Sequence, residues 1–338
     1  MYFFYYSNNI FFKENKKIGA IDFAGEIILK PEFEFLDEIS FNEDLLQFKK
    51  LQHFGLISLT QGVVLEVSYD FEIEEVKNYY IIKNNTNNLK GLLNQNYDIV
   101  LPVKYSSIDI CQELLTKNNL FQEVEYFELE LNNKKGLYII KLNKIIFPIY
   151  DNIDFIDFFF FVKMKNKEGV FDFEGNEILE CFYSFGKYFN YGVHQYVEIE
   201  NNNNYDLFDL LNKKYILQNY KECKKISGCE NFVLQIKKEN LIKYKNLDTC
   251  KETIYQFEDL YEQANAENDR QSFLDYYRFS DERLIIKKDG QFGFMDKNFV
   301  EIIKCQFENA LPFKNGRAEI HNNHKTFFID IYGNKILL

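Results

Sequence analysis

Short apolar segments alternate with polar turns along the whole chain, and one pattern of positions recurs. In residues 291–307, Gly293 is followed three residues later by Asp296, nine later by Ile302 and fourteen later by Phe307. Five further glycines have an aromatic residue at the same fourteen-residue distance: Gly19 with Phe33, Gly55 with Tyr69, Gly91 with Tyr105, Gly136 with Tyr150, and Gly169 with Tyr183. A fixed motif that recurs along a chain predicts stacked structural repeats.

Three further copies lack the glycine at this anchor position. Asp206 leads to Tyr220 and Lys243 leads to Phe257 at the same distance, while Phe327 begins a shorter copy. The steps between the nine anchors, residues 19, 55, 91, 136, 169, 206, 243, 293 and 327, are 36, 36, 45, 33, 37, 37, 50 and 34 residues. The two long steps predict insertions at about residues 111–131 and 261–281.

The residues inside each copy predict a strand, a tight turn and a second strand. The third residue after the anchor is Asp, Asn or Ser in every copy except the one with Ile139, and these side chains cap turns. The ninth is β-branched or aromatic in all but one copy, which suits a packed strand. An alternating segment before each anchor adds a third strand, and acidic segments such as Asp37-Glu38 and Glu74-Glu75 are interpreted as solvated edges or connections.

The predicted fold class is therefore all-β: an array of about nine three-stranded antiparallel β-meander repeats. The repeats leave no span for another domain, so a single domain over residues 1–338 is expected. Each unit would bury its apolar face only against its neighbours. Unequal spacing favours an open superhelix or solenoid, and a closed β-propeller-like ring is the alternative; the distance between the chain ends would decide between them.

One helix is predicted near residues 263–278, because this stretch contains no glycine or proline and its apolar residues can share a helical face. Two roles stay open for it. It contacts a partner, in which case the candidate residues are Asp269, Asp275, Tyr276 and Tyr277, or it covers an exposed sheet edge.

The first insertion predicts a longer hairpin that carries several acidic residues. Glu123, Glu125 and Glu128 alternate with apolar residues, a pattern typical of a strand with one solvated face. An acidic docking strip for a partner is the second interpretation of the same three glutamates.

A known family shares this pattern. Residues 291–320 resemble the tryptophan-glycine (WG) repeat, a β-rich unit that combines an aromatic-glycine pair, an apolar-Asp turn, an apolar strand and a Phe-x-x-Gly segment. The residues that carry the resemblance are Phe292-Gly293, Asp296, Ile302, Phe307, Pro312-Phe313 and Gly316. The chain contains no tryptophan, and Phe54, Tyr205 and Phe292 are the only aromatic residues directly before an anchor. The resemblance implies a binding or scaffolding array without a common catalytic site.

Charge and cysteine content narrow the possible partners and compartment. The formal net charge of −12 argues against nucleic acid, which is bound by Lys and Arg clusters; it suits a protein partner with a basic surface, or serves solubility. The six cysteines show neither disulfide nor zinc spacing, which indicates buried thiols in a reducing compartment. The sequence shows no leader and no apolar run of membrane-spanning length, so a cytoplasmic protein is expected.

Residue patterns that would carry chemistry are weak. The pair His321-x-x-His324 has metal-ligand spacing, but it falls on a polar hairpin, and a surface role is preferred. Asp22, Asp172, Asp209, Asp296 and Asp330 resemble a bank of carboxylates, yet their fixed place at turns explains them. No catalytic residue, cofactor or metal ligand is predicted.

The sequence thus predicts a non-catalytic protein–protein interaction or scaffold protein. A narrower hypothesis is an immunity-type inhibitor that covers the basic site of a toxin or nuclease. The alternative is an enzyme or ligand-binding protein with a polar site at the centre of a ring-shaped array.

Overall fold

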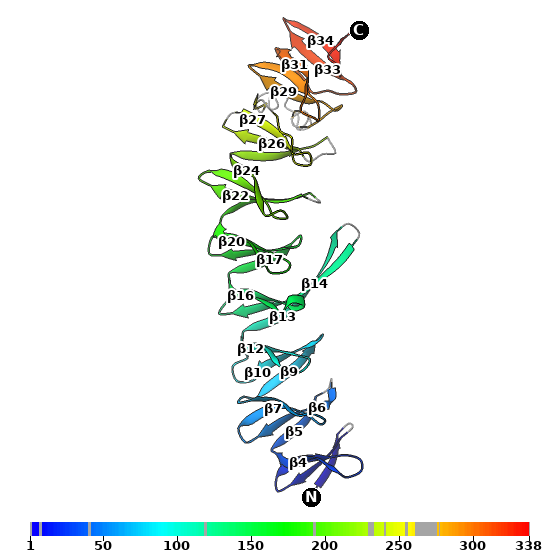
Figure 1. Ribbon diagram of the computed structural model, residues 1–338, viewed down its shortest axis with the longest axis vertical. Coiled ribbons are helices and arrows are strands. Elements are labelled where there is room, and N and C mark those ends of the chain that lie inside the picture. The colour runs from blue at the N-terminus through cyan, green and yellow to red at the C-terminus, as the bar shows by residue number, and fades with distance from the viewer. Residues whose placement is uncertain are drawn as a thin grey trace. The chain divides into compact units, whose positions relative to one another are not determined.

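The computed structural model describes residues 2–6, 9–39, 42–117, 120–191, 194–228, 233–239, 241–253, 256–260, 276 and 278–337. Over these residues the chain forms nine antiparallel sheets, eight with four strands and one with three (Figure 1). The chain divides into two compact units, Met1–Tyr183 and Ser184–Leu338. The single domain expected over residues 1–338 stays a prediction beside this division.

The first unit contains five sheets, in each of which the strands pair in chain order. Their strands are β1 (Tyr2–Tyr6), β2 (Asn9–Glu14), β3 (Lys17–Ile21) and β4 (Ile27–Phe33); β5 (Phe35–Ile39), β6 (Asn42–Lys50), β7 (His53–Ser58) and β8 (Gly62–Val67); β9 (Phe71–Val76), β10 (Tyr79–Asn84), β11 (Lys90–Asn94) and β12 (Ile99–Tyr105); β13 (Ser107–Lys117), β14 (Leu120–Leu131), β15 (Lys134–Ile139) and β16 (Lys144–Tyr150); and β17 (Asn152–Ile156), β18 (Phe159–Met164), β19 (Lys167–Asp172) and β20 (Glu177–Tyr183).

The second unit contains four sheets with the same meander order. Their strands are β21 (Phe185–Tyr191), β22 (His194–Asn201), β23 (Asn204–Asp209) and β24 (Lys214–Tyr220); β25 (Glu222–Ile226), β26 (Val233–Lys238), β27 (Leu241–Asn246) and β28 (Phe257–Glu258); β29 (Leu284–Lys288), β30 (Gln291–Met295) and β31 (Glu301–Phe307); and β32 (Asn309–Ala310), β33 (Arg317–Asn322), β34 (Lys325–Asp330) and β35 (Lys335–Ile336).

Eight of the nine sheets contain four strands, one more than the three strands predicted per repeat. The additional strand is the first one of each four-stranded sheet, and after the first sheet only one to three residues separate it from the last strand of the preceding sheet. Strands β5 and β9 contain Asp37-Glu38 and Glu74-Glu75, the segments interpreted as edges or connections. They are edge strands with one solvated face, where acidic residues point outward while Leu36 lies in the core.

Successive sheets are tied together where one ends and the next begins. The single linking residue donates its backbone N–H to the second strand of the following sheet: Glu34 to the Lys49 carbonyl at 2.7 Å, and Asp151 to the Lys163 carbonyl at 2.7 Å. In the second unit Lys221 donates to the Lys237 carbonyl at 2.9 Å. Each link therefore places the next sheet against the previous one.

The apolar cores lie between neighbouring sheets of the same unit. The core between the first two sheets combines Phe11 and Phe33 of one sheet with Leu36, Phe48 and Ile57 of the other. Equivalent cores join each following pair of sheets inside each unit. A lone sheet would leave these faces in water, so the repeats stabilise one another.

The anchor glycine is required because the last strand of the sheet crosses directly over it. A Cβ atom at Gly19, Gly136 or Gly293 would lie 2.5 to 2.6 Å from the backbone carbonyl oxygen of the residue ten positions later. The pairing register is irregular at this point, with three residues of the last strand opposite the glycine alone. The glycine therefore makes room for a bulge rather than for an unusual φ.

The buried position of the strand that follows the anchor strand is the tenth residue after the anchor. Leu101, Ile146 and Ile303 at this place are 0%, 5% and 4% exposed, whereas Ile302 at the ninth place is 37% exposed. The ninth residue lies in the strand, as its β-branched character predicts, and Val64, Val100 and Ile145 at this place are partly buried against the cores. The most buried position is one residue later, because the pairing register shifts at this point. Most aromatic residues of the fourteenth position are buried: Phe33, Tyr105, Tyr150, Tyr220, Phe257 and Phe307. Tyr69 and Tyr183 are half-buried.

The repeated Asp, Asn and Ser residues hold the turns between the third and fourth strands, as predicted. Asp172 Oδ1 accepts the backbone N–H groups of Glu174 and Asn176 at 3.1 and 2.8 Å. Asp22 and Asp296 each accept two backbone N–H groups in the same way, from the second and fourth residues that follow them. Gly25 lies in the turn after Asp22 and has a φ of +88°. These carboxylates are therefore used for backbone geometry.

Among the described residues, the helical element is the short 3₁₀ turn η1 (Ile140–Leu142). It takes the place of the Asp turn in the fourth copy, which has Ile139 at the turn position. The helix predicted near 263–278 lies outside them except for Tyr276 and Arg278, and Arg278 forms a parallel β-bridge with Ser227. Among the described residues, no helix has the length and apolar character to span a membrane.

Candidate functional site

The predicted acidic strip lies on the long hairpin of β13 and β14, which the first insertion forms. The register of this hairpin is continuous, so Glu123 and Glu125 project from one face of β14 and Glu128 from the other. Glu125 pairs with Lys77, and Glu128 Oε1 lies 2.7 Å from Lys135 Nζ. The strand therefore places Glu128 on the opposite face from Glu123 and Glu125.

The predicted binding residues of the second insertion are mostly beyond the described part of the chain. Asp269, Asp275 and Tyr277 lie outside the described residues. Tyr276 is described and is 2% exposed, within the core of the last two sheets. The side chain of Tyr276 therefore packs inside the protein.

In the histidine pair of the last sheet, His321 makes local contacts and His324 lies in a turn. His321 Nε2 lies 3.0 Å from Glu319 Oε1, and His324 occupies the turn between β33 and β34 with φ of +56°. In the described part of the chain, no three or more His, Cys, Asp or Glu side chains are grouped to hold a metal ion.

Another histidine, His194, connects two sheets of the second unit. His194 Nε2 lies 2.7 Å from Asp248 Oδ1, and His194 Nδ1 lies 2.8 Å from the Tyr196 hydroxyl. His194 begins β22, whereas Asp248 lies in the turn after β27. Burial raises the pKa of Tyr196. The arrangement ties the two sheets together through a chain of three polar groups.

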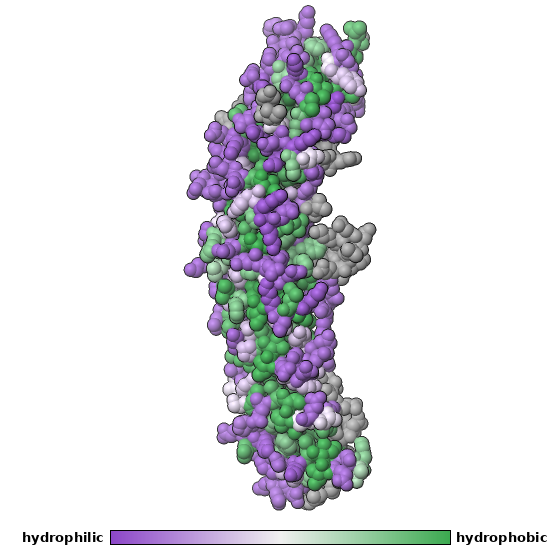
Figure 2. Space-filling model, in the orientation of Figure 1, coloured by the Kyte–Doolittle hydropathy of each residue, from purple (hydrophilic) through white to green (hydrophobic). Residues whose placement is uncertain are grey.

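Large apolar side chains reach the surface along the fourth strands. Phe147 and Ile149 of β16 are 65% and 50% exposed, Phe182 of β20 is 68% exposed, and Ile99 of β12 is 58% exposed. The fourth strand is the edge of each sheet, so its outer backbone groups are not paired within that sheet. Figure 2 shows hydrophobic residues reaching the viewed surface among hydrophilic ones in both units.

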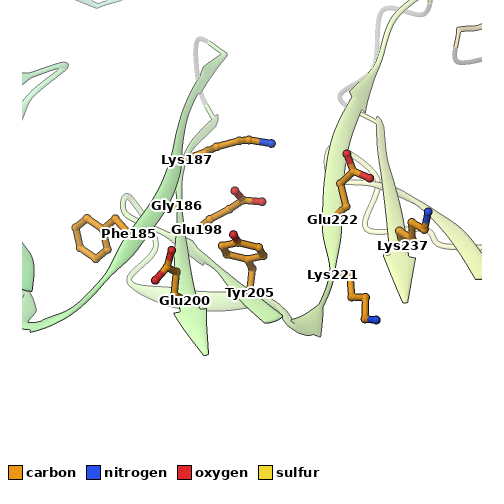
Figure 3. Close-up of a pocket in the computed structure, with 9 residues that line it drawn as sticks. All are labelled: Phe185, Gly186, Lys187, Glu198, Glu200, Tyr205, Lys221, Glu222 and Lys237. Atoms are coloured by element: carbon orange, nitrogen blue, oxygen red, sulfur yellow. The ribbon is translucent and has the colours of Figure 1, made fainter. Parts of the chain in front are cut away.

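A polar groove of about 650 Å³ lies between neighbouring sheets of the second unit. One wall comes from β21, β22 and β23, and the other from the segment that leads into β25 and from β26 (Figure 3). The lining residues are Phe185, Gly186, Lys187, Glu198, Glu200, Tyr205, Lys221, Glu222 and Lys237.

Glu198 is the buried acid of this groove. Its side chain is 3% exposed, and Tyr220 donates its hydroxyl to Glu198 Oε1 at 3.0 Å. Burial raises the pKa of the Glu198 carboxyl, while the Tyr220 hydroxyl and Lys187 oppose that rise. Burial also raises the pKa of Tyr220, so the phenol keeps the proton that it donates.

Tyr205 forms the aromatic part of the wall, next to Glu198 in Figure 3. It lies against Gly186 of β21, where an added Cβ would be 2.9 Å from Tyr205 Cε1 and 3.3 Å from Glu198 Cβ. Gly186 thus allows the tyrosine ring and the glutamate to stand side by side.

Charges on the opposite wall are partly neutralised by neighbours outside the groove. Lys237 Nζ lies 2.6 Å from Asp259 Oδ2, and Lys224 Nζ lies 3.0 Å from Glu222 Oε1. Lys221 is exposed at the rim. The groove therefore combines a buried carboxylate and an aromatic ring with cations that are paired or at the edge.

Sequence reasoning did not find this groove. Glu198 sits in a strand whose neighbours on both faces are buried, and no spacing distinguishes it from a core position. One available signal was the residue before the anchor, where Tyr205 stands in this copy and Lys135 stands in the fourth copy.

Comparison with known proteins supports the repeat assignment locally. The family model for the WG containing repeat matches residues 292–323, the region on which the resemblance was based. No curated protein matches the chain significantly.

Several solved structures share a distant likeness. Kluyveromyces lactis Hsv2 with its complete loop 6CD is 7% identical over 74% of this chain and 94% of its own, with a TM-score of 0.21. The dihydro-heme d1 dehydrogenase NirN in complex with DHE is 11% identical over 98% of this chain and 72% of its own, with a TM-score of 0.23. Apo AztD from Citrobacter koseri is 8% identical over 72% and 84%, with a TM-score of 0.22. Likenesses of this size carry no argument about function.

Proposed function

We propose that this chain is a non-catalytic protein–protein interaction or scaffold protein. The observation that carries the proposal is the repeated edge strand with exposed large apolar side chains, in particular Phe147, Ile149 and Phe182. An edge strand offers backbone hydrogen bonds, and exposed aromatic residues are the side chains that anchor protein interfaces.

Partner capture with variants of the edge residues tests the proposal. The chain is used as bait, and bound proteins are identified by mass spectrometry. We expect one stoichiometric partner with a basic surface, which the double change Phe147→Ser and Phe182→Ser releases. Glu174→Ser, an exposed turn position of the same unit, is the control and should retain it. Equal capture by both variants would remove the edge strands from the binding role.

The narrower proposal is an immunity-type inhibitor of a toxin or nuclease. The net charge of −12 supports it, because an acidic surface attracts a basic partner. The test adds the purified chain to the captured partner at equal molarity and measures the partner's catalytic activity. Loss of that activity supports inhibition, whereas full activity in the complex favours a scaffold.

We further propose an open superhelical array rather than a closed propeller-like ring. The unequal repeat spacing supports the open form. Nine sheets stacked about 10 Å apart would extend over roughly 90 Å. Small-angle X-ray scattering measures the longest dimension of the protein in solution, and a markedly shorter value with adjacent chain ends would favour the ring.

The alternative function, an enzyme or ligand-binding protein with a polar site, has one observation in its favour. The groove beside Glu198 combines a buried carboxylate, an aromatic ring and a volume of about 650 Å³. A ligand site of this kind is compatible with the protein-binding proposal when the ligand is a side chain of the partner.

A cytoplasmic location is kept as a proposal. Five cysteines, Cys111, Cys181, Cys223, Cys250 and Cys305, have free thiols, which supports a reducing compartment. Fractionation of cells that express the full-length protein would test it.

A further inference from the structure

The fourth and sixth sheets carry the same pair of glutamates at the same register. In the fourth sheet Glu128 and Glu130 pair with Leu137 and Lys135 of the next strand. In the sixth sheet Glu198 and Glu200 pair with Leu207 and Tyr205. The two sites are therefore equivalent positions of the repeat, and they differ in the residue before the anchor, Lys135 or Tyr205.

Lys135 neutralises its glutamates within the repeat. Its Nζ lies 2.7 Å from Glu128 Oε1, and the hydrogen bond with Glu128 raises the pKa of Lys135. Both side chains are about one-third exposed, at 32% for Glu128 and 33% for Lys135. The carboxylates of the fourth sheet thus have their own ammonium group.

The sixth sheet has no cation at the position of Lys135. Tyr205 occupies the place of Lys135, and Glu198 is buried behind it with a neutral donor, the Tyr220 hydroxyl. Lys187 also lines the groove, but it comes from β21 and not from the position of Lys135; its charge and its backbone N–H oppose the rise in the pKa of Glu198. Figure 3 shows the Glu198 carboxylate and the Tyr205 ring side by side at the groove.

We propose that the groove beside Tyr205 binds a cationic side chain of a protein partner, an arginine, whose guanidinium takes the place that the Lys135 ammonium has in the fourth sheet. The inference rests on the proposed protein-binding function and names the chemistry of one contact. A planar guanidinium stacks on an aromatic ring and donates to two carboxylates at once, here Glu198 and Glu200.

The test uses N-acetyl-arginine N-methylamide as the probe, with the citrulline compound as its uncharged isostere. Binding to the full chain is followed by ligand-observed NMR. We expect millimolar binding of the arginine compound, typical of a single side chain, and at least tenfold weaker binding of the citrulline compound. Equal binding of the two compounds would overturn the proposal.

Swapping the residue before the anchor gives the sharpest variants. Tyr205→Lys supplies the internal ammonium that the fourth sheet has, so we expect at least a tenfold loss of arginine binding. Glu200→Gln, at an exposed position, should weaken binding of the arginine compound without affecting folding. It therefore tests the site even if the Tyr205→Lys variant does not fold. Glu128→Gln is the matched control and should bind as the original chain does. Undiminished binding by both groove variants contradicts the proposal.

Failure of this inference and failure of the proposed function are distinguishable. If a basic partner binds the original chain and the Tyr205→Lys variant equally, the interaction function stands and the arginine site is wrong. If the probe binds as expected while no protein partner is captured, the cation site stands and the interaction function is wrong.

Discussion

The sheet of β17–β20 and the sheet of β21–β24 solve the same geometric problem in different ways. In the first, three residues of β20 lie opposite Gly169, where a Cβ would be 2.8 Å from the Leu179 carbonyl oxygen. In the second, two residues of β24 lie opposite Asp206, and Asp206 Oδ1 accepts the Asn219 backbone N–H at 2.7 Å. The second sheet replaces close backbone contact with a side-chain hydrogen bond.

This comparison explains how one copy can lack the anchor glycine and still keep the fourteen-residue distance. Tyr183 and Tyr220 end the fourth strand in both sheets, although the bulge of the second sheet is one residue shorter. The turn of the second sheet is one residue longer and compensates for the shorter bulge. Phe171 and Phe208 both lie two residues after their anchors, but Phe171 pairs with Glu177, eight residues after its anchor, and Phe208 pairs with Tyr215, nine residues after its anchor. The repeat therefore conserves the total path of the strand pair and not the shape of its bulge.

The largest expected effect comes from Gly169→Ala. The new Cβ would meet backbone atoms of Leu179 and Cys181 at 2.8 to 2.9 Å, and backbone cannot yield as a side-chain tip does. We expect a loss of about 3 kcal/mol or more in the free energy of unfolding. Hydrogen exchange of β17–β20 measures it, because repeats unfold locally.

Gly25→Ala is the control for this prediction. Gly25 has φ of +88° and no neighbour within 4 Å of an added Cβ, so only backbone strain of about 1 to 2 kcal/mol is expected. Equal losses at Gly169 and Gly25 would mean that backbone conformation, and not the crossing strand, selects the anchor glycine.

Asp206→Gly is expected to have the next largest effect, and it sharpens the comparison. The change restores the anchor glycine that six other copies have, but it removes the acceptor of the Asn219 N–H and the partner of Asn201 Nδ2 at 3.1 Å. We expect a loss of about 1 to 3 kcal/mol, measured by urea unfolding or hydrogen exchange. Asp206→Asn keeps the accepting oxygen and should lose less. A stabilising effect of Asp206→Gly would contradict the conclusion that the Asp206 hydrogen bond replaces the close backbone contact made at Gly169.

The turn residues should respond alike in the two sheets. Asp172 and Asp209 each accept two backbone N–H groups and one asparagine side chain. We expect Asp172→Ala and Asp209→Ala to cost about 1 kcal/mol each, measured by thermal unfolding. A much larger cost at one position would show that the two turns are not equivalent.

Sequence reasoning recovers the features that depend on local chemistry. Asp172 holds a turn through its own nearest neighbours, and Gly169 faces a residue only ten positions away. Both signals therefore recur within each copy. The first strand of the second sheet, β5, was missed because its buried residues, such as Leu36, alternate with acids, as in a solvated connection.

The groove beside Glu198 depends on chain segments that are far apart in sequence. Strands β21, β22 and β23 supply one wall, and Lys237 of β26 contributes to the other. Only the pairing register reveals that Tyr205 stands where Lys135 stands in the fourth sheet. A periodic pattern predicts the repeated scaffold, but it does not show that the sixth copy has Tyr205 in place of the lysine that pairs with Glu128 in the fourth copy.

The smallest expected effect, Glu198→Gln, tests whether the sixth sheet has a buried acid without a counter-charge. Burial raises the pKa of Glu198 above its ordinary value of 4.5, so the folded state holds this proton more tightly than the unfolded chain does. The stability that the protonated acid contributes is present below pH 4.5 and is lost as the pH rises through the folded-state pKa. Glutamine keeps an acceptor for Tyr220 and does not titrate.

We therefore expect Glu198→Gln to raise the melting temperature, relative to the original chain, more at pH 7 than at pH 4, with a change in stability on the order of 0.5 kcal/mol. Glu128→Gln, whose carboxylate pairs with Lys135, should show no such gain at pH 7. A loss of stability for Glu198→Gln at pH 7 would mean that the original carboxylate is stabilised by a cation already within the protein. The place assigned to the partner's arginine would then be filled.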